Sequence, residues 1–313
     1  IILTRACYGC RSLYNIHKKR RATMKIVHTV KEVRETINNW KKEGKTIGLV
    51  PTMGYLHEGH QSLIKASVAG NDKTVVSVFV NPTQFGPNED YASYPRDLKK
   101  DAALCEATGA DLIFNPEPEE MYPDGFCSYV NITGLSDALC GKSRPIHFKG
   151  VCTVVSKLFN IVTPDRAYFG EKDAQQLAII RRMVKDLNFP LEIVGCPIIR
   201  EEDGLAKSSR NTYLNTEERK AALILSKSIF AGKEMVENGE TDANAVVARM
   251  KEIINSEPLA VIDYVEMVNM DTMKNIDTIE GSVLCAIAVK IGKTRLIDNF
   301  ISIENTPAST SGE

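Results

Sequence analysis

The sequence lacks several features that would assign it to large classes of proteins. No apolar run approaches the roughly 20 residues that a membrane-spanning helix needs, so we expect no membrane segment. The net charge is only −1, which gives no reason to expect a nucleic-acid partner. The GxxxxG segment from Gly54 to Gly59 is not followed by Lys-Ser or Lys-Thr, which excludes a Walker phosphate loop.

Cysteine occurs without the spacing of a zinc site. Cys7 and Cys10 form a CxxC pair, but no second pair and no histidine follows at zinc-finger distance. The other six of the eight cysteines are scattered singly through apolar or mixed segments. We therefore expect reduced and mostly buried thiols, which are typical of a cytoplasmic protein.

Acidic residues are absent from the first 23 positions, which contain six lysines and arginines. Because the whole chain carries a net charge of −1, the remaining residues carry −7. The segment also lacks the apolar core of a signal peptide. We predict that residues 1–23 are a basic extension outside the fold, either an upstream segment or an organellar transit peptide. The folded chain then begins at Met24, and the Ser/Thr/Pro/Gly-rich residues 305–313 form a disordered tail.

Apolar runs alternate with amphipathic segments through the first two thirds of the 313 residues. Strands are predicted at residues 46–50, 73–80, 112–114, 166–169 and 191–196, and helices at 30–42, from 60 onward, and at 97–108, 150–162 and 174–187. This alternation predicts an α/β fold with a Rossmann-like, mainly parallel sheet. Two helices, at 216–238 and 243–255, then precede strands at 262–268, 283–289 and 294–300. We therefore expect one domain at residues 24–197 and a smaller C-terminal α+β lid domain at residues 198–304.

The segment TIGLVPTMGYLHEGHQSLIK, residues 46–65, combines a strand, a glycine-containing loop and a helix. That layout brings backbone N–H groups and a helix N-terminus to an anion. His57 and His60 lie on one side of the helix start, and Gly59 between them leaves room for a ligand. Two imidazoles there could stabilise negative charge that develops on a phosphate. The alternative is a surface loop with two incidental histidines.

Two further segments place polar side chains at strand or helix ends. Gln84 follows a strand and could bind a hydroxyl or carboxylate without adding charge, although a solvent-exposed turn is the alternative. His147 precedes a helix, where it either lines a ligand site or only begins the helix.

The segment GEKDAQQ, residues 170–176, follows a strand and opens a helix. Gly170 permits close approach of a nucleotide, Asp173 could accept from ribose hydroxyls, and Lys172 could meet a phosphate. Gln176, about one turn further, could reach a second substrate. An exposed first helical turn is the alternative.

The segment KSSRN, residues 207–211, offers two hydroxyls and two cations close to Gly204. This combination suits a mobile phosphate clamp, and a polar interdomain linker is the alternative.

Taken together, these motifs resemble those of the pantoate–β-alanine ligase family, within the superfamily of HIGH-signature nucleotidylyltransferases and class I aminoacyl-tRNA synthetases. The matching segments are PTMGxLHxGH from Pro51, FVNPxQF from Phe79, HFxG from His147, GxKDxQQ from Gly170 and the KMSKS-like LAxSSRN from Leu205. The resemblance covers residues 24–304. Many relatives carry Met at the position of Lys207, so a phosphate contact by this side chain stays open.

The resemblance implies an ATP-dependent ligase that condenses (R)-pantoate with β-alanine through a pantoyl-adenylate intermediate and releases AMP and pyrophosphate. It also implies Mg²⁺ bound with ATP, no organic prosthetic group, a cytoplasmic location and a homodimer, without nucleic-acid or membrane partners. Three other functions stay open: a nucleotidylyltransferase that leaves AMP on its product, a non-catalytic nucleotide-binding regulator and, least favoured, a tRNA synthetase fragment.

The resemblance also implies roles for individual residues. His60 is expected to be the main catalytic residue, together with His57 and Lys172. Binding of ATP is expected of Pro51, Thr52, Met53, Gly54, His57, Gly59, His60, Gly170, Glu171, Lys172, Asp173, Ile199, Lys207, Ser208, Ser209 and Arg210. Binding of pantoate or β-alanine is expected of Asn81, Gln84, His147 and Gln176. Asp101, which follows the YPR segment, is expected to bind Mg²⁺, with a solvated helix carboxylate as the alternative.

Overall fold

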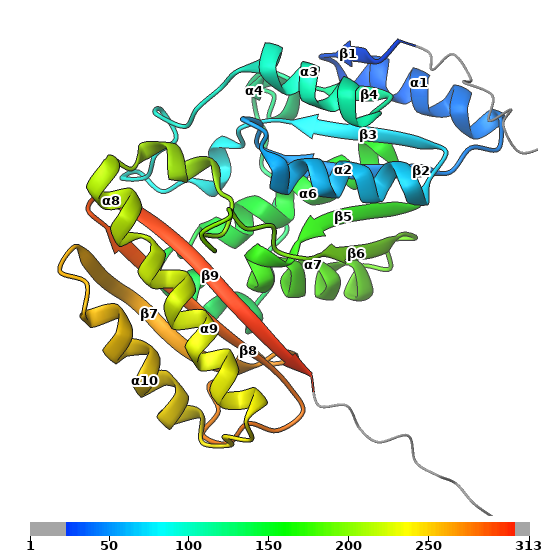
Figure 1. The fold of residues 1–313 in the computed structure, drawn as a ribbon. Coiled ribbons are helices and arrows are strands. Elements are labelled where there is room, and N and C mark those ends of the chain that lie inside the picture. The colour runs from blue at the N-terminus through cyan, green and yellow to red at the C-terminus, as the bar shows by residue number, and fades with distance from the viewer. Residues whose placement is uncertain (1–22, 304–313) are drawn as a thin grey trace, which may run out of the picture.

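The computed structural model describes residues 23–303, and a six-stranded parallel sheet forms its larger part (Figure 1). The strand order is β1-β4-β3-β2-β5-β6. The strands are β1 (Lys25–Val27), β2 (Ile47–Thr52), β3 (Lys73–Val78), β4 (Leu112–Phe114), β5 (Arg166–Gly170) and β6 (Glu192–Cys196). The chain builds outward from β2 to β3 and β4, then returns to place β5 on the other side of β2. The strand order therefore reverses between β2 and β5, which is where open α/β sheets bind ligands.

Helices cover both faces of this sheet. They are α1 (Val30–Lys42), α2 (Glu58–Gly70), α3 (Leu98–Thr108), α4 (Pro118–Met121), α5 (Cys140–Ser143), α6 (His147–Val162) and α7 (Ala174–Asp186). Side chains of β2 alternate between the two faces: Leu49 belongs to the core under α1, α6 and α7, and Val50 to the core under α2 and α3. Burial on both faces explains the nearly continuous apolar runs of the central strands.

The C-terminal part is a separate antiparallel sheet of order β7-β8-β9, with its own helices. Its elements are α8 (Thr216–Ala221), α9 (Leu223–Glu237), α10 (Ala243–Asn255), β7 (Ala260–Asn269), β8 (Ser282–Ile291) and β9 (Thr294–Ile303). One apolar cluster, which includes Ile229, Met250 and Ile287, joins α9 and α10 to the sheet. Figure 1 shows β9 on the side of this sheet that faces β6 and α7 of the larger part.

The structure confirms the predicted parallel α/β sheet with a smaller C-terminal α+β part. Several elements differ from the prediction, and α6, for example, begins at His147 rather than at Gly150. The edge strand β1 was missed, because three residues carry too little pattern. The single helix predicted at residues 216–238 is two, since the Leu225 N–H bonds to the Ala222 carbonyl three residues back and tightens the turn. Helix α2 begins at Glu58 rather than His60, with His57 as its cap.

Other predictions concern the ends of the chain and the thiols. The basic extension predicted at residues 1–23 lies outside the described residues except for residue 23, and the tail predicted at residues 305–313 lies wholly outside them. Of the six cysteines in the described range, four are buried and all six are free thiols, as predicted. Within residues 23–303, no helix combines the length and apolar character needed to cross a membrane.

Candidate active site

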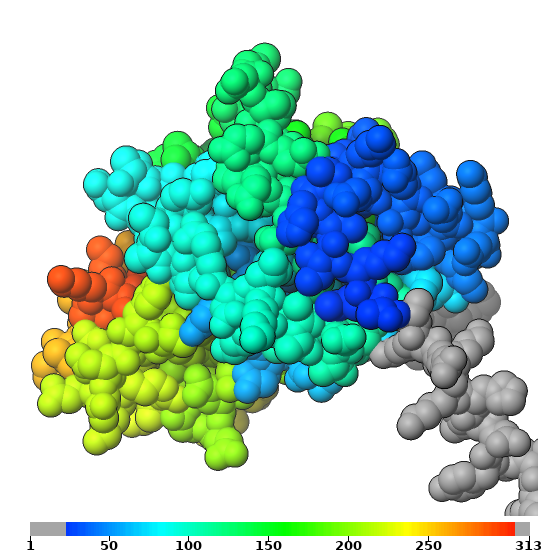
Figure 2. Space-filling view, turned by 90° about the horizontal axis from the view of Figure 1, so that it is seen from above, coloured from blue at the N-terminus to red at the C-terminus, as the bar shows by residue number. Residues whose placement is uncertain are grey.

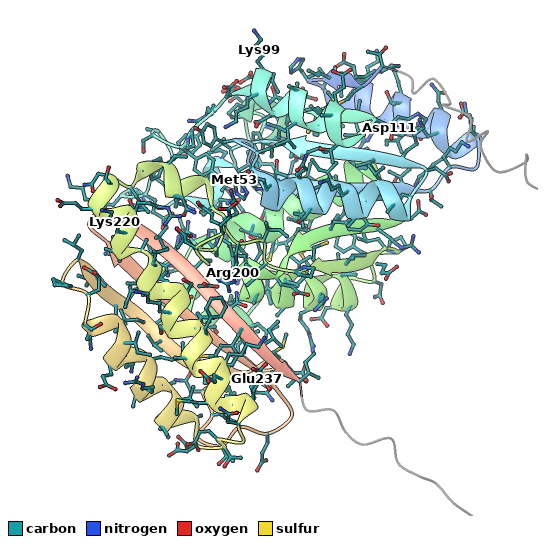
Figure 3. All side chains as sticks on the ribbon, in the orientation of Figure 1. Met53, Lys99, Asp111, Arg200, Lys220 and Glu237 are labelled. Atoms are coloured by element: carbon teal, nitrogen blue, oxygen red, sulfur yellow. The ribbon has the colours of Figure 1, made fainter. Side chains whose placement is uncertain are left out.

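A cavity of about 230 Å³ lies at the carboxyl ends of β2 and β5, at the reversal of strand order. Residues that follow β6, including Ile199 and residues 207–210, line it from the side of the C-terminal part. All predicted site residues line the cavity except Gly54, Asp101 and Glu171. Figure 3 shows Met53, one of the lining residues, in the region between the two sheets where many side chains converge.

His57 and His60 hold each other in place at the N-terminus of α2. Nδ1 of His57 accepts the Gly59 N–H at 3.1 Å, and Nδ1 of His60 accepts the His57 N–H at 3.3 Å. The two ring centroids are 4.1 Å apart. A neutral imidazole that accepts at Nδ1 carries its proton on Nε2, so each ring keeps one donor for a ligand.

The charge state of both rings follows from their surroundings. Burial, and next the charge of Lys172, lowers the pKa of His57 to about 4. Burial also lowers the pKa of His60 well below its usual range, and the charges of His57 and Lys172 add to this effect. Near pH 7 both imidazoles are therefore neutral hydrogen-bond donors rather than cations.

Lys172 and Asp173 supply opposite charges just after β5. They belong to the short 3₁₀ helix η3 (Glu171–Asp173), and Nζ of Lys172 lies 3.3 Å from Oδ2 of Asp173. Burial acts to raise the pKa of Asp173, but the charge and hydrogen bond of Lys172 outweigh it, so the pKa is lowered. An ammonium and a carboxylate thus both reach the cavity, whereas Glu171 does not line it.

Gln84 is oriented by the loop that contains it. Its Oε1 accepts from Nδ2 of Asn81 at 3.0 Å, and its Nε2 lies 3.1 Å from Sδ of Met53. Asn81 has its own polar atoms engaged within the protein: Nδ2 also donates to the Gly150 carbonyl, and Oδ1 accepts from the Tyr122 hydroxyl at 2.7 Å. Gln84 therefore presents its amide edge toward the cavity, while Asn81 fixes its orientation.

Helix α6 packs directly against this loop because Gly150 has no side chain. A Cβ atom at Gly150 would overlap the carbonyl of Thr83 and the backbone of Gln84. His147, at the start of α6, donates from Nδ1 to the Gln84 carbonyl at 3.0 Å. Burial, and next the charge of Arg144, lowers the pKa of His147 to about 3. His147 is thus a neutral lining residue whose Nε2 remains an acceptor.

The predicted phosphate clamp reaches the larger part of the molecule through its side chains. Arg210 makes two hydrogen bonds to Asp90, from Nε at 2.9 Å and from Nη2 at 2.8 Å. Nζ of Lys207 lies 3.1 Å from a carboxylate oxygen of Glu58. The Ser208 hydroxyl caps the short helix η4 (Ser209–Tyr213) by accepting the Arg210 N–H. All three residues line the cavity, so the loop forms one of its walls.

Asp101 is hydrogen-bonded to the loop between β2 and α2, and it does not line the cavity. It is 1% exposed, and its two oxygens accept the N–H groups of Tyr55 at 2.9 Å and Leu56 at 2.7 Å. Tyr55 has a φ of 51°, an uncommon conformation for a residue with a side chain, and Gly54 has a φ of 82°. The expectation that Asp101 binds Mg²⁺ does not fit this geometry, because the carboxylate is buried outside the cavity and its oxygens accept the N–H groups of the loop.

No group of three or more His, Cys, Asp or Glu side chains in residues 23–303 could hold a metal ion. Mg²⁺ commonly binds through one or two carboxylates, phosphate oxygens and water rather than through an all-protein cage. Asp173 is the carboxylate among the predicted ATP-binding residues that faces the cavity.

Three polar residues of the cavity wall were missed as site residues in the sequence. Arg144 lines the cavity and makes two hydrogen bonds to Glu89, at 2.7 and 2.6 Å, but it stands in no recognisable motif. Tyr94 lies with its ring 5.6 Å from the Arg210 guanidinium. The Ser77 hydroxyl is buried and, within the described part of the chain, has no hydrogen-bond partner. A single polar residue in the apolar run of β3 was the available signal for Ser77.

Comparison with known proteins identifies the family of the chain. A model of the family described as pantoate–β-alanine ligase matches residues 25–301. The chain belongs to the pantoate–β-alanine ligase family. Pantothenate synthetase from Ruminiclostridium cellulolyticum is 64% identical over 277 residues, which cover 88% of this chain and 98% of that protein. Pantothenate synthetase from Enterococcus faecalis is 63% identical, with the same coverage of both chains.

Solved structures of the pantoate–β-alanine ligase family share the fold. Pantothenate synthetase from Thermus thermophilus is 45% identical, with a TM-score of 0.85, and the match covers 88% of this chain and 99% of that one. A pantoate–β-alanine ligase from Francisella tularensis, complexed with β,γ-ATP and β-alanine, is 35% identical, with a TM-score of 0.72 and coverage of 89% and 97%. The family therefore includes a member whose structure contains both a nucleotide and β-alanine.

Proposed function

We propose that this protein uses ATP to condense (R)-pantoate with β-alanine, forming pantothenate, AMP and pyrophosphate. The observation that carries the proposal is the composition of one cavity wall. Neutral imidazole donors, the cations of Lys172 and Arg210, and the carboxamides of Gln84 and Gln176 all line the same cavity. A nucleotide triphosphate needs the donors and cations, and a hydroxy acid needs neutral groups that bind hydroxyls and a carboxylate.

The first step joins pantoate to the α-phosphorus of ATP. A carboxylate oxygen of pantoate forms the new O–P bond while the bond from phosphorus to pyrophosphate breaks. Such a transfer depends on alignment and on stabilising negative charge, and it needs no protein nucleophile. Nε2–H of His60 and of His57 would donate to the phosphoryl oxygens, and the Lys172 ammonium would balance their charge. Gln84 and Gln176 would hold the hydroxyls and carboxylate of pantoate.

The second step transfers the pantoyl group to β-alanine. The unprotonated amine attacks the acyl carbon of the adenylate, the new C–N bond forms, and the bond to AMP breaks. The amine proton passes to solvent. The residues 207–210 would keep water from the mixed anhydride while AMP is still bound.

A divalent metal is consistent with a ligase that uses ATP, and we propose Mg²⁺. It would enter with the ATP phosphates and meet the carboxylate of Asp173, not Asp101, whose oxygens are engaged by backbone N–H groups. Bound there, the ion would neutralise phosphate charge.

We also propose that residues 24–197 and 198–304 act as two domains, the second as a lid, because most apolar clusters fall within one or the other range.

We further propose a homodimer in the cytoplasm. Figure 2 shows the green region that follows β4 projecting from the molecular surface. Between β4 and α6, Tyr129 is 48% exposed and Ile146 is 47% exposed, and a partner subunit would cover these apolar side chains. The free thiols fit a reducing compartment.

Product analysis tests the proposed reaction. The protein is incubated with ATP, Mg²⁺ and pantoate, with or without β-alanine, and products are identified by mass spectrometry. Exchange of labelled pyrophosphate into ATP is expected with pantoate alone, and AMP and pantothenate only when β-alanine is added. A product that retains AMP would identify a nucleotidylyltransferase. ATP binding without pyrophosphate release in any mixture would identify a regulator and remove the basis for the catalytic assignments.

A further inference from the structure

Two adjacent polar residues, Asp298 and Asn299, lie in the middle of strand β9, and both are almost completely buried. Strand β9 is an edge strand of the antiparallel sheet, so one side has no neighbouring strand of that sheet. A buried amide and a buried carboxylate are costly unless they are hydrogen-bonded. Their partners belong to the two loops that carry the proposed nucleotide-binding residues.

Asn299 is hydrogen-bonded to the backbone of η3. Its Nδ2 donates to the carbonyl of Glu171 at 3.0 Å and to the carbonyl of Lys172 at 2.8 Å. Because a carbonyl oxygen only accepts, the atom that faces both must be the amide nitrogen, and both of its N–H bonds are used. The C-terminal sheet thus holds the backbone of Lys172 directly.

Asp298 holds the other loop at its base. Its carboxylate accepts two hydrogen bonds from Arg200, at 2.7 and 2.9 Å, and Arg200 also donates to the Gly204 carbonyl at 3.0 Å. Arg200 and Ala206 form an antiparallel bridge that closes the turn before residues 207–210. Figure 3 shows Arg200 beside β9, in the region between the two sheets.

We propose that Asp298 and Asn299 are positioning residues that set the two nucleotide-binding loops relative to each other, with Asn299 holding Lys172 against the histidines. The inference rests on the proposed function of this cavity. Neither residue lines the 230 Å³ cavity, although both line a second cavity of about 670 Å³ that shares Lys172 and Arg210 with it. Because their side-chain hydrogen bonds go to Arg200 and to the backbone of η3, they act through Lys172 and through the loop at residues 207–210. Strand β9 therefore anchors η3 and the base of the loop at residues 207–210 to each other, while the side chains of Lys207 and Arg210 can still exchange their partners.

The electrostatics of the site support this arrangement. The charge of Lys172 is one of the causes that lower the pKa of both His57 and His60, after burial. Glu58 and Asp173 raise the pKa of His57 and Lys207 lowers it, but the effect of Lys172 is the largest among these charges. If η3 moves away, Lys172 and Asp173 move together, and because Lys172 has the larger effect the pKa of each histidine rises. Asn299 should therefore affect how activity depends on pH, which a residue that only stabilises the fold would not do.

The test compares Asn299→Ala with Phe300→Leu. Phe300 is the next residue of β9, and it packs in the apolar cluster of the C-terminal part, so Phe300→Leu weakens the same sheet without touching η3. Asn299→Gln, which keeps the amide on a longer side chain, serves as the conservative variant. Each protein is measured for thermal unfolding, for ATP affinity by calorimetry and for pantoate-dependent pyrophosphate exchange from about pH 4 to about pH 9, so that the profile reaches the pKa of His57.

We expect Asn299→Ala to weaken ATP binding and to lower kcat/KM for ATP by about tenfold or more, since a displacement of about 1 Å can cost up to about 100-fold. The acidic limb of its pH profile should move to higher pH. Phe300→Leu should lower thermal stability but leave the ATP affinity and the pH profile unchanged. Asn299→Gln should show a smaller loss of ATP affinity and a smaller shift of the pH profile than Asn299→Ala. If Asn299→Ala does not fold, Asn299→Ser, which keeps one donor, takes its place in the same comparison.

The proposal would be overturned if the Asn299 variants lost ATP affinity only in proportion to their loss of thermal stability, with an unchanged pH profile. The ATP affinities answer this question even if the wild type shows no pantoate-dependent exchange. In that case the proposed ligase reaction fails while the positioning role is still decided.

Discussion

Two loops frame the cavity, and they are held in different ways. The loop after β2 is fixed from below, where the buried carboxylate of Asp101 accepts the N–H groups of Tyr55 and Leu56. At its far end, His57 and His60 close the first turn of α2 through a mutual capping arrangement. Every one of these contacts involves the backbone, so the loop moves only if its hydrogen bonds break.

The loop at residues 207–210 is held mainly by side chains. Arg210 pairs with Asp90, Lys207 pairs with Glu58, and the Ser209 hydroxyl donates to the Tyr55 carbonyl at 3.2 Å. The two ion pairs are partly exposed to solvent, where such pairs contribute little to stability.

The difference separates two requirements of the proposed reaction. A group that stabilises charge in a transition state works best when it is already in place. A group that closes over a substrate must exchange its partners, and a phosphate can replace a carboxylate as the partner of an arginine. The loop after β2 therefore suits the stabilisation of charge in the transition state, and the loop at residues 207–210 suits closure over the substrate.

The largest expected effect comes from removing a fixed donor. We expect His60→Ala to lower the rate of adenylate formation by about 10² or more, as for loss of one donor to a developing oxyanion. Single-turnover measurement of pyrophosphate release checks this. His28→Ala, at an exposed histidine outside the cavity, is the control and should retain the normal rate. Near-normal turnover in His60→Ala would remove the catalytic role.

A second prediction tests what fixes the first loop. Asp101→Ala leaves two backbone N–H groups of the loop without their acceptor, so it should lower the free energy of unfolding by about 2 kcal/mol or more. Urea unfolding measures the change, and Asp124→Ala, at an exposed carboxylate, is the matched control. If stability is unchanged but the Mg²⁺ concentration needed for activity rises, Asp101 is a metal ligand after all.

The third prediction concerns the exchangeable loop. Arg210→Ala should raise KM for ATP by about tenfold, because a cation at the phosphates is lost. Asp90→Asn removes only the resting partner of Arg210, so KM for ATP should change by no more than about threefold. Steady-state kinetics with ATP as the varied substrate distinguishes the two. Equal increases in KM for ATP in the two variants would mean that ATP binding requires the Arg210–Asp90 ion pair rather than Arg210 alone.

The smallest expected effect is a pH dependence of stability that belongs to the first loop. The folded pKa of His57, about 4, lies below the usual 6.5. The unfolded chain therefore binds more protons, and this contribution to the free energy of unfolding is complete above pH 6.5 and lost as the pH falls toward 4. His57→Asn keeps an N-cap side chain but does not titrate, so its stability should fall less between pH 7 and pH 5. Parallel urea titrations of both proteins measure this difference, and identical slopes would contradict it.

Much of this protein is determined by local sequence. Apolar β-branched runs such as that of β3 become buried strands wherever the chain places them, and the segment around His57 and His60 carries its own turn residues and helix start. The order of strands and helices therefore predicted the parallel sheet, and contiguous motifs predicted most of the cavity wall.

The tertiary structure decided what depends on contacts between distant segments. Asp101 has the sequence context of an exposed helix carboxylate, yet packing turns it inward to hold a loop 45 residues earlier in the chain. Arg144 and Asn299 stand in no motif, and each acquires its place only when segments 55 and 127 residues apart come together. Periodicity and spacing describe neighbours along the chain, whereas burial and hydrogen-bond partners across it exist only once the two sheets have packed.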